Sequence, residues 1–180
     1  MEIDIQKKSI RKEIKILKSK IDIEDKKKRS KIILKKLQSN EKFINADTVM
    51  LYWSMDDEVF THDFILEWYN KKKIILPCVK GDLLELREFQ GIDTMKKGEN
   101  YGILEPVGEI FSDYNNIDLI LVPGVAFDLD NNRMGRGKAY YDKLLRNLDS
   151  YKVGLCFDFQ LLKTVPTDKY DIKMDIVVSD

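Results

Sequence analysis

Three cations and two glycines in one short segment are the residues with the clearest chemical potential. Arg133, Arg136 and Lys138 fall within six residues around Gly135 and Gly137, after an apolar run and before a helical pattern. At such a junction, free backbone N–H groups and the positive end of a helix dipole attract anions, and glycine lets the backbone approach them closely. A tight turn with ordinary surface cations gives a similar pattern, but the density of positive charge favours a phosphate ligand.

This segment does not match the two most familiar phosphate motifs. A Walker A loop needs glycine at position 132 and serine or threonine at 139, where the chain has Asn132 and Ala139. A dinucleotide fingerprint that starts at Gly135 needs a third glycine at position 140, which is Tyr140. The segment therefore indicates another kind of phosphate binding.

Other catalytic arrangements are missing from the sequence. His62 is the only histidine, which excludes a mechanism with two histidines and favours a structural role for this ring. The sequence holds no GxSxG or HExxH pattern, which argues against a serine hydrolase and a zinc protease. Cys78 and Cys156 lie in apolar surroundings without ligand spacing, so we predict buried thiols in a reducing compartment.

The elements that must position the cationic segment are those of an α/β fold. Short apolar runs are typical of parallel strands buried on both faces, and they occupy residues 49–53, 74–77, 119–123, 153–157 and 176–178. Helical patterns intervene at 63–71 and 139–148, and residues 83–89 form an extra strand or hairpin. This alternation predicts a mostly parallel sheet covered by helices on both faces, in a three-layer αβα arrangement.

A pair of helices is predicted before the first strand. The first helix has one apolar stripe, formed by Ile10, Ile14, Leu17 and Ile21. Asp22 can cap a second helix that runs toward Leu37. On the first helix, Lys7 and Arg11 are four residues apart and share a face; from spacing alone, a solvated face explains this pair at least as well as a ligand site.

Composition bounds the class of protein. A chain of 180 residues with 43% hydrophobic and 34% charged residues predicts one folded domain, residues 1–180. The sequence shows no apolar run long enough for a membrane helix and no signal peptide at its start, so we expect a cytoplasmic protein without a membrane partner. Residues 1–42 hold 13 Lys and 2 Arg against 7 acids, but no aromatics interleave with them, which favours a solvated helical face over nucleic-acid binding.

The sequence resembles the 5-formyltetrahydrofolate cyclo-ligase family over nearly its whole length. Residues 122–142 are similar to the family signature in which a PGxAFD strand end leads to NRxGxGxGYYD. Further segments resemble family blocks in the same order, at residues 7–11, 52–59, 101–106, 154–160 and 171–178. Three positions depart from the pattern: Ala139 replaces a usual glycine, Tyr170 a common histidine and Leu86 a frequent methionine. We expect Ala139 to add a methyl near the phosphates and Leu86 to reshape the folate pocket.

The resemblance implies a C–N bond-forming cyclo-ligase of the CoA-transferase-like fold type. ATP and Mg²⁺ would serve as co-substrate and metal in converting 5-formyltetrahydrofolate to 5,10-methenyltetrahydrofolate, with phosphorylation of the formyl oxygen, attack by N10 and release of ADP and phosphate. Small molecules would be the only partners, and we expect a monomer.

The resemblance also implies the site residues. Catalysis would fall to Arg133, Arg136, Lys138 and Tyr140. ATP would contact Lys7, Lys8, Ser9, Ile10, Arg11, Arg133, Met134, Gly135, Arg136, Gly137, Lys138, Ala139, Tyr140 and Tyr141. Folate would contact Trp53, Met55, Glu58 and Tyr140. The metal would bind Asp142 and Asp175; from spacing alone, these are equally a first-turn acid and a strand-edge acid.

Some alternatives stay open at this point. Trp53 also fits a core position and Glu58 an exposed one. Because Tyr140 and Tyr141 are adjacent on a helix, we predict that at most one of them, Tyr140, faces the cleft. A phosphosugar- or coenzyme-A-handling enzyme and a noncatalytic nucleotide sensor are the competing functions.

Overall fold

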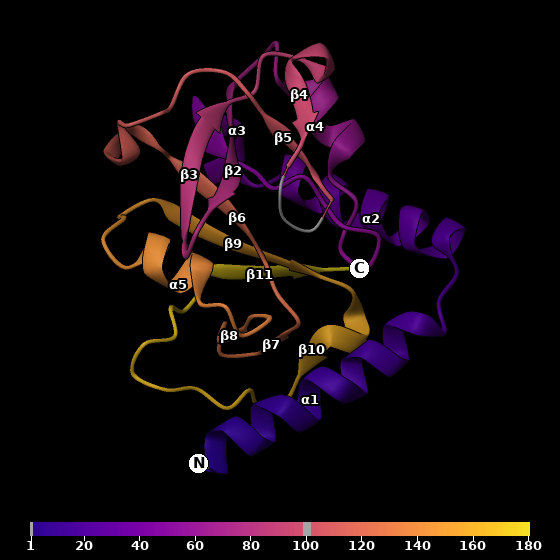
Figure 1. The fold of residues 1–180 in the computed structure, drawn as a ribbon. Helices are drawn as coiled ribbons and strands as arrows, with labels where there is room; N and C mark the ends of the chain where they lie inside the picture. Colours follow the sequence, from indigo (N-terminus) through magenta and orange to yellow (C-terminus); the bar gives the residue numbers. More distant parts are fainter. Residues whose placement is uncertain (1, 99–101) are drawn as a thin grey trace.

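The computed structural model describes residues 2–98 and 102–180, so Tyr101 of the predicted family block lies outside the described residues. Within these ranges a six-stranded sheet has the order β11-β9-β6-β1-β2-β3 (Figure 1). Its members are β1 (Thr48–Met50), β2 (Lys73–Lys80), β3 (Leu83–Glu88), β6 (Leu119–Pro123), β9 (Tyr151–Cys156) and β11 (Ile176–Ser179). Neighbours are parallel except β2 and β3. This confirms the mostly parallel sheet and the extra strand at 83–89.

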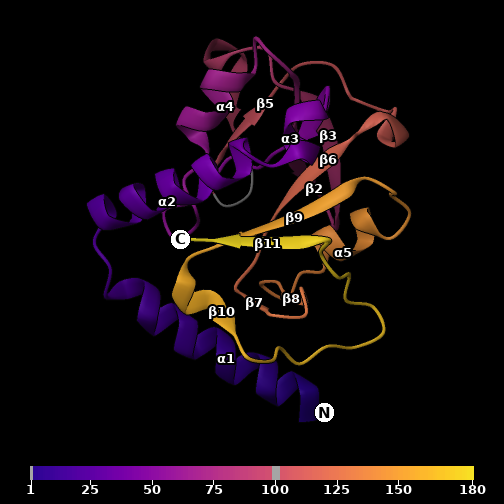
Figure 2. The same cartoon turned by 180° about the vertical axis from the view of Figure 1, so that it is seen from behind.

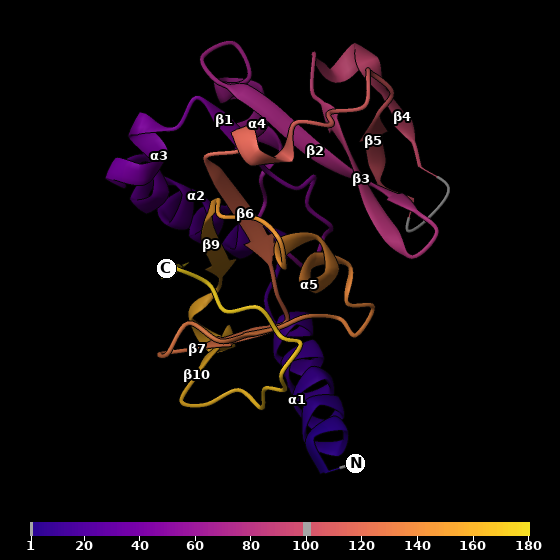
Figure 3. The same cartoon turned by 90° about the vertical axis from the view of Figure 1, so that its left-hand side faces the viewer.

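Helices cover both faces of this sheet because successive strand residues point to opposite sides. Val49 and Leu51 pack under α2 (Ile23–Gln38), α3 (Glu41–Asn45) and α4 (His62–Trp68). Met50, between them, packs on the other side with Leu145 of α5 (Tyr140–Leu145). The edge-on view in Figure 3 shows α2 and α3 on one side of β6 and α5 on the other, as the sequence predicted.

The two N-terminal helices are present but cover different parts of the molecule. Asp22 caps α2 by accepting a hydrogen bond from the Asp25 N–H at 2.8 Å, as predicted. The first helix, α1 (Glu2–Ser19), instead lies against a small sheet (Figures 1 and 2). Ile14 of this helix is buried there. The strands of this small sheet are β7 (Ala126–Asp128), β8 (Arg133–Met134) and β10 (Leu161–Leu162). The prediction that Ile21 continues the apolar stripe is wrong, because α1 ends at Ser19 and Ile21 lies in the turn beyond it.

A short hairpin of β4 (Met95–Lys97) and β5 (Leu104–Pro106) lies beside β2 (Figure 3). The Glu105 carboxylate accepts a hydrogen bond from the Val79 N–H of β2 at 3.1 Å. One-turn 3-10 helices occur at η1 (Ile92–Thr94), η2 (Tyr114–Asn116) and η3 (Asp158–Gln160). Within the described ranges, no helix combines the length and apolar character needed to cross a membrane.

Candidate active site

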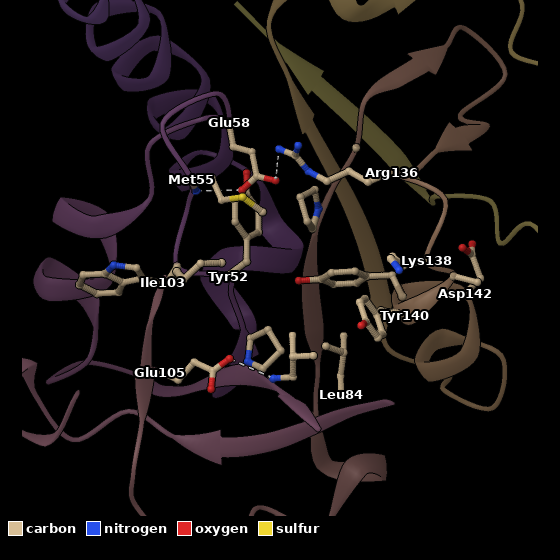
Figure 4. Close-up of a pocket in the computed structure, with 18 of the residues that line it drawn as sticks. Tyr52, Met55, Glu58, Leu84, Ile103, Glu105, Arg136, Lys138, Tyr140 and Asp142 are labelled. Atoms are coloured by element: carbon tan, nitrogen blue, oxygen red, sulfur yellow. Dashed lines mark hydrogen bonds and ion pairs between the residues drawn. The ribbon is translucent and has the colours of Figure 1, made fainter. Parts of the chain in front are cut away.

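A cavity of about 930 Å³, counting its open mouth, lies beyond the carboxyl ends of β1 and β6 (Figure 4). In open α/β sheets this edge is the usual place for a ligand. Its walls come from the segment after β1, the ends of β2, β3 and β6, the strand β5, and the cationic segment before α5. The lining residues are Tyr52, Trp53, Met55, Glu58, Pro77, Val79, Leu84, Ile103, Leu104, Glu105, Pro123, Gly124, Arg133, Gly135, Arg136, Lys138, Ala139, Tyr140, Tyr141 and Asp142. All of the residues predicted for catalysis and folate binding therefore line one cavity.

Arg133 anchors the cationic segment to the sheet and to α5. Its guanidinium is only 4% exposed, donates to the Pro123 carbonyl at 3.1 Å and forms an ion pair with Asp142 at 2.8 Å. The Nε atom is buried and has no partner among the described residues. A cation this deeply buried needs the carboxylate beside it, so the pair fixes the start of the segment against the cavity wall.

Arg136 joins the predicted phosphate segment to the predicted folate wall. It forms ion pairs with Asp57 at 2.5 Å and with Glu58 at 3.1 Å (Figure 4 shows the Glu58 contact). Glu58 is 8% exposed, so it is not the surface residue that the alternative interpretation expected, and it also accepts the Met55 N–H at 3.0 Å. Burial lowers the pKa of Arg136, but the two carboxylates outweigh this effect and raise it.

Lys138 and the residue after it shape the open side of the cavity. Lys138 is exposed and makes no hydrogen bond or ion pair with any described residue. Ala139 precedes α5 with φ of 55°, in the left-handed region that favours glycine. This geometry gives a physical reason for a glycine at that position, and Ala139 is among the residues that line the cavity.

Both tyrosines of α5 line the cavity, so the prediction that only one faces the cleft is wrong. The cavity wraps around the first turn of α5, where two adjacent side chains can reach different walls. The Tyr140 hydroxyl donates to the Gly81 carbonyl at 3.3 Å. Tyr141 lies near Glu58, and burial together with that carboxylate raises its pKa, which keeps the phenol neutral.

The N-terminal residues predicted to bind ATP do not share one environment. The Arg11 Nε–H donates to the Gly135 carbonyl at 2.9 Å, so this residue touches the cationic segment. Lys7 forms ion pairs with Asp171 at 2.5 Å and Asp168 at 3.0 Å. Burial lowers the pKa of Lys7, but these two carboxylates outweigh it and raise the pKa.

The remaining members of that predicted set lie outside the cavity lining. Lys8 and Ser9 are exposed, and Ile10 packs toward Val125 and Met134, because consecutive residues on a helix point in different directions. Met134 is 1% exposed beneath α1, so its side chain belongs to the core. Gly137 has φ of 97° and lies against the Arg11 guanidinium.

The two predicted metal ligands are not brought together. Asp142 lines the cavity and accepts the Ile172 N–H at 3.2 Å. Asp175 precedes β11 at the amino edge of the sheet, where its carboxylate accepts the Lys152 N–H at 2.7 Å. The residue next to Ile172 is Asp171, an acid that sequence reasoning did not assign to the metal. Acids at 171 and 175 both suit a metal, and in the fold it is Asp171 that adjoins the backbone N–H bonded to Asp142. Among the described residues, no cluster of three or more His, Cys, Asp or Glu is gathered for a metal.

The apolar side of the cavity contains the predicted aromatic wall. Trp53 lines it and stacks on His62, with ring centroids 4.0 Å apart. Met55 lines it as well, whereas Leu86 does not. Leu86 is fully buried with Ile75 on the α5 side of the sheet, so the expectation that it reshapes the pocket is wrong.

The fold and cavity define an α/β protein that can place an anionic ligand on a cationic segment beside a flat apolar ligand. A model of the 5-formyltetrahydrofolate cyclo-ligase family matches residues 4–180, and the chain belongs to this family. The predicted family and enzyme class are therefore confirmed.

Relatives and solved structures agree with this assignment. The chain is 28% identical to the mouse 5-formyltetrahydrofolate cyclo-ligase over 98% of its own length and 94% of the relative. It is 34% identical to the Haemophilus influenzae enzyme of that name over 74% of its own length and 76% of the relative. The Aquifex aeolicus 5,10-methenyltetrahydrofolate synthetase superposes with a TM-score of 0.87 and 34% identity, covering 96% of this chain and 89% of that one. The Mycoplasma pneumoniae 5,10-methenyltetrahydrofolate synthetase superposes with a TM-score of 0.76 and 26% identity, covering 96% of this chain and 97% of that one.

Proposed function

We propose that the protein uses ATP to convert 5-formyltetrahydrofolate to 5,10-methenyltetrahydrofolate, releasing ADP and phosphate. The observation that carries this proposal is the ion pair between Arg136 and Glu58, which links the cationic segment to the wall beside Trp53 within one cavity. Two ligands bound on these walls would meet at the pair. An anionic nucleotide tail suits the cations, and a flat ring with N–H donors suits Trp53 and the Glu58 carboxylate.

The reaction requires the formyl oxygen to leave the formyl carbon. The formyl oxygen attacks the γ-phosphorus and ADP departs. N10 then attacks the formyl carbon and loses its proton to water, and the carbon–oxygen bond breaks with the oxygen leaving as phosphate. Positioning and charge neutralisation are the main tasks of the protein in such a transfer. Lys138, exposed and without a described partner, is free to bind transferring phosphate oxygens, and Arg136 lies between them and the folate wall.

The carboxylates near α5 fit a magnesium ion. Asp142 Oδ1 accepts the Arg133 and Ile172 bonds, and Asp171 Oδ2 accepts the Lys7 and Asp168 bonds. The other oxygen of each carboxylate accepts no hydrogen bond from the described residues, which leaves it available. Mg²⁺ prefers one or two carboxylates together with phosphate oxygens and water, and when bound it offsets phosphate charge. We therefore propose Asp142 and Asp171 as its protein ligands.

We also propose that the chain acts as a single domain and a cytoplasmic monomer with small-molecule partners. Size-exclusion chromatography coupled to light scattering tests the monomer, for which a mass near 21.1 kDa is expected. A mass near twice that value would reject it.

Ligand protection separates the proposed function from the competing ones. Thermal unfolding is measured with 5-formyltetrahydrofolate, with a non-hydrolysable ATP analogue and Mg²⁺, with a phosphosugar and with coenzyme A. The proposal predicts protection by the folate and by the ATP analogue, since a ligand that binds only the folded state raises its stability. Protection by the nucleotide without the folate would favour a sensor, and protection by phosphosugar or coenzyme A alone would favour the other enzyme class.

A further inference from the structure

A row of alternating charges runs from the last turn of α1 to the cavity. Lys18 Nζ lies 3.3 Å from Asp57 Oδ2, and Asp57 Oδ1 lies 2.5 Å from an Arg136 terminal nitrogen. The same Arg136 nitrogen contacts Glu58 Oε1 at 3.1 Å. Glu58 Oε2 accepts the Met55 N–H, so this carboxylate is fixed from both sides.

The first member of the row is buried far more than a surface lysine. The Lys18 side chain is 6% exposed, against 39% for Asp57 and 42% for Arg136. Lysine is seldom buried to this degree without a partner, because removing an ammonium from water is costly. Burial lowers the pKa of Lys18, and the Asp57 charge opposes that effect.

The two oxygens of Asp57 have different partners, and this explains how Lys18 can affect Arg136 without touching it. Lys18 takes Oδ2 and leaves Oδ1 for Arg136. Without Lys18, both oxygens become available to the arginine, whose fork binds a carboxylate best through two parallel bonds. That arrangement would turn Arg136 toward Asp57 and away from Glu58.

We propose that Lys18 is a positioning residue: by engaging one oxygen of Asp57, it holds Arg136 on Glu58 at the junction of the two ligand walls. Lys18 does not line the cavity, so it acts only through Asp57. The kinetic consequence rests on the proposed function, whereas the geometric consequence does not.

The test uses Lys18→Met, which keeps the length of the buried side chain and removes its charge, and Asp57→Asn, which removes the link. Lys15→Met, at an exposed position on the same helix, is the matched control. For each protein, the Michaelis constants for 5-formyltetrahydrofolate and for ATP are measured. We expect the folate constant to rise roughly tenfold in Lys18→Met, the size of one lost charge-assisted hydrogen bond. It should stay near its original value in Asp57→Asn, where no carboxylate draws Arg136 away from Glu58, and in the control.

The double variant decides whether Lys18 works through Asp57. If it does, Lys18→Met with Asp57→Asn raises the folate constant no more than Asp57→Asn alone, since residues in one chain of contacts are not additive. Additive effects, or an unchanged folate constant in Lys18→Met, would overturn the inference. Asp57→Asn lies at a half-exposed position and decides the matter if Lys18→Met does not fold. A tenfold rise of the folate constant in Asp57→Asn alone would mean that Asp57 itself holds Arg136 on Glu58, which overturns the inference.

A measurement without substrate separates this inference from the proposed function. The guanidinium protons of Arg136 are followed by NMR in the ligand-free protein, where the two ion pairs should slow their exchange with water. We expect a nuclear Overhauser contact between these protons and the Glu58 side chain in the unaltered protein and in Lys15→Met, and its loss in Lys18→Met, where the arginine turns to Asp57. A Glu58 contact that persists in Lys18→Met refutes the positioning role even in a protein that turns over no folate.

Discussion

Replacement of Arg133 by methionine tests how the buried ion pair supports the cavity. The change removes the bonds to Pro123 and Asp142 and leaves Asp142, 9% exposed, with only the Ile172 N–H at 3.2 Å. Breaking a buried pair on one side costs about 3–5 kcal/mol, because a charge stays buried without its partner. At about 2–4 °C per kcal/mol for a chain of this size, the unfolding midpoint should fall by roughly 10 °C.

The assay is urea and thermal unfolding followed by circular dichroism, with two comparison variants. Lys27→Met removes an ion pair between two exposed side chains, Lys27 and Glu24, and should cost at most about 1 kcal/mol. Arg133→Met combined with Asp142→Asn removes both buried charges and should recover much of the loss of the single change. The reasoning is refuted if Arg133→Met destabilises no more than Lys27→Met, or if the double variant is less stable than Arg133→Met by the full cost of a second charge.

Three further outcomes follow from the site. Lys138→Ala should raise the Michaelis constant for ATP by roughly tenfold or more, as one charge-assisted contact to phosphate is lost; unchanged ATP kinetics, with circular dichroism showing an intact fold, would reject the phosphate contact. Asp171→Asn should weaken activation by Mg²⁺ in a metal titration and Asp175→Asn should not; the reverse order would restore Asp175 as the ligand. Burial lowers the pKa of His62 below its usual 6.5, so the unfolded state binds more protons. The free energy of unfolding should therefore decline as pH falls through about 6.5 and below. In urea unfolding, His62→Gln should show a shallower decline with pH, and the same pH dependence in both proteins would contradict the assignment.

The main sheet was predictable because its strands carry a local signal. Residues 119–123 form an apolar run buried on both faces, and β6 has those bounds. The small sheet carries no such signal: β8 and β10 have two residues each, and Leu161 pairs with Phe127 only after the chain has folded back. Strand pairings of this kind depend on contacts between residues distant in sequence, and the hydrophobic periodicity of a short segment does not show them.

The same distinction separates the parts of the site. The cations of the segment before α5 were predictable because they fall within six residues and follow a strand end. The partners of Lys7 were not, since Asp171 lies 164 residues further along the chain. The interpretation of Leu86 was wrong because its place in a family block does not show which way its side chain points. In the fold, Leu86 points to the α5 face of the sheet and packs in the core. Spacing defines a motif, but the direction of each side chain is set by the fold.

The central claim is tested most directly by near-ultraviolet absorbance of the purified protein with 5-formyltetrahydrofolate, ATP and Mg²⁺. The proposed function predicts the absorbance of 5,10-methenyltetrahydrofolate to grow with time, and to stay flat when ATP is omitted or when EDTA removes the metal. Absence of the methenyl product under conditions where ATP still binds would contradict the account.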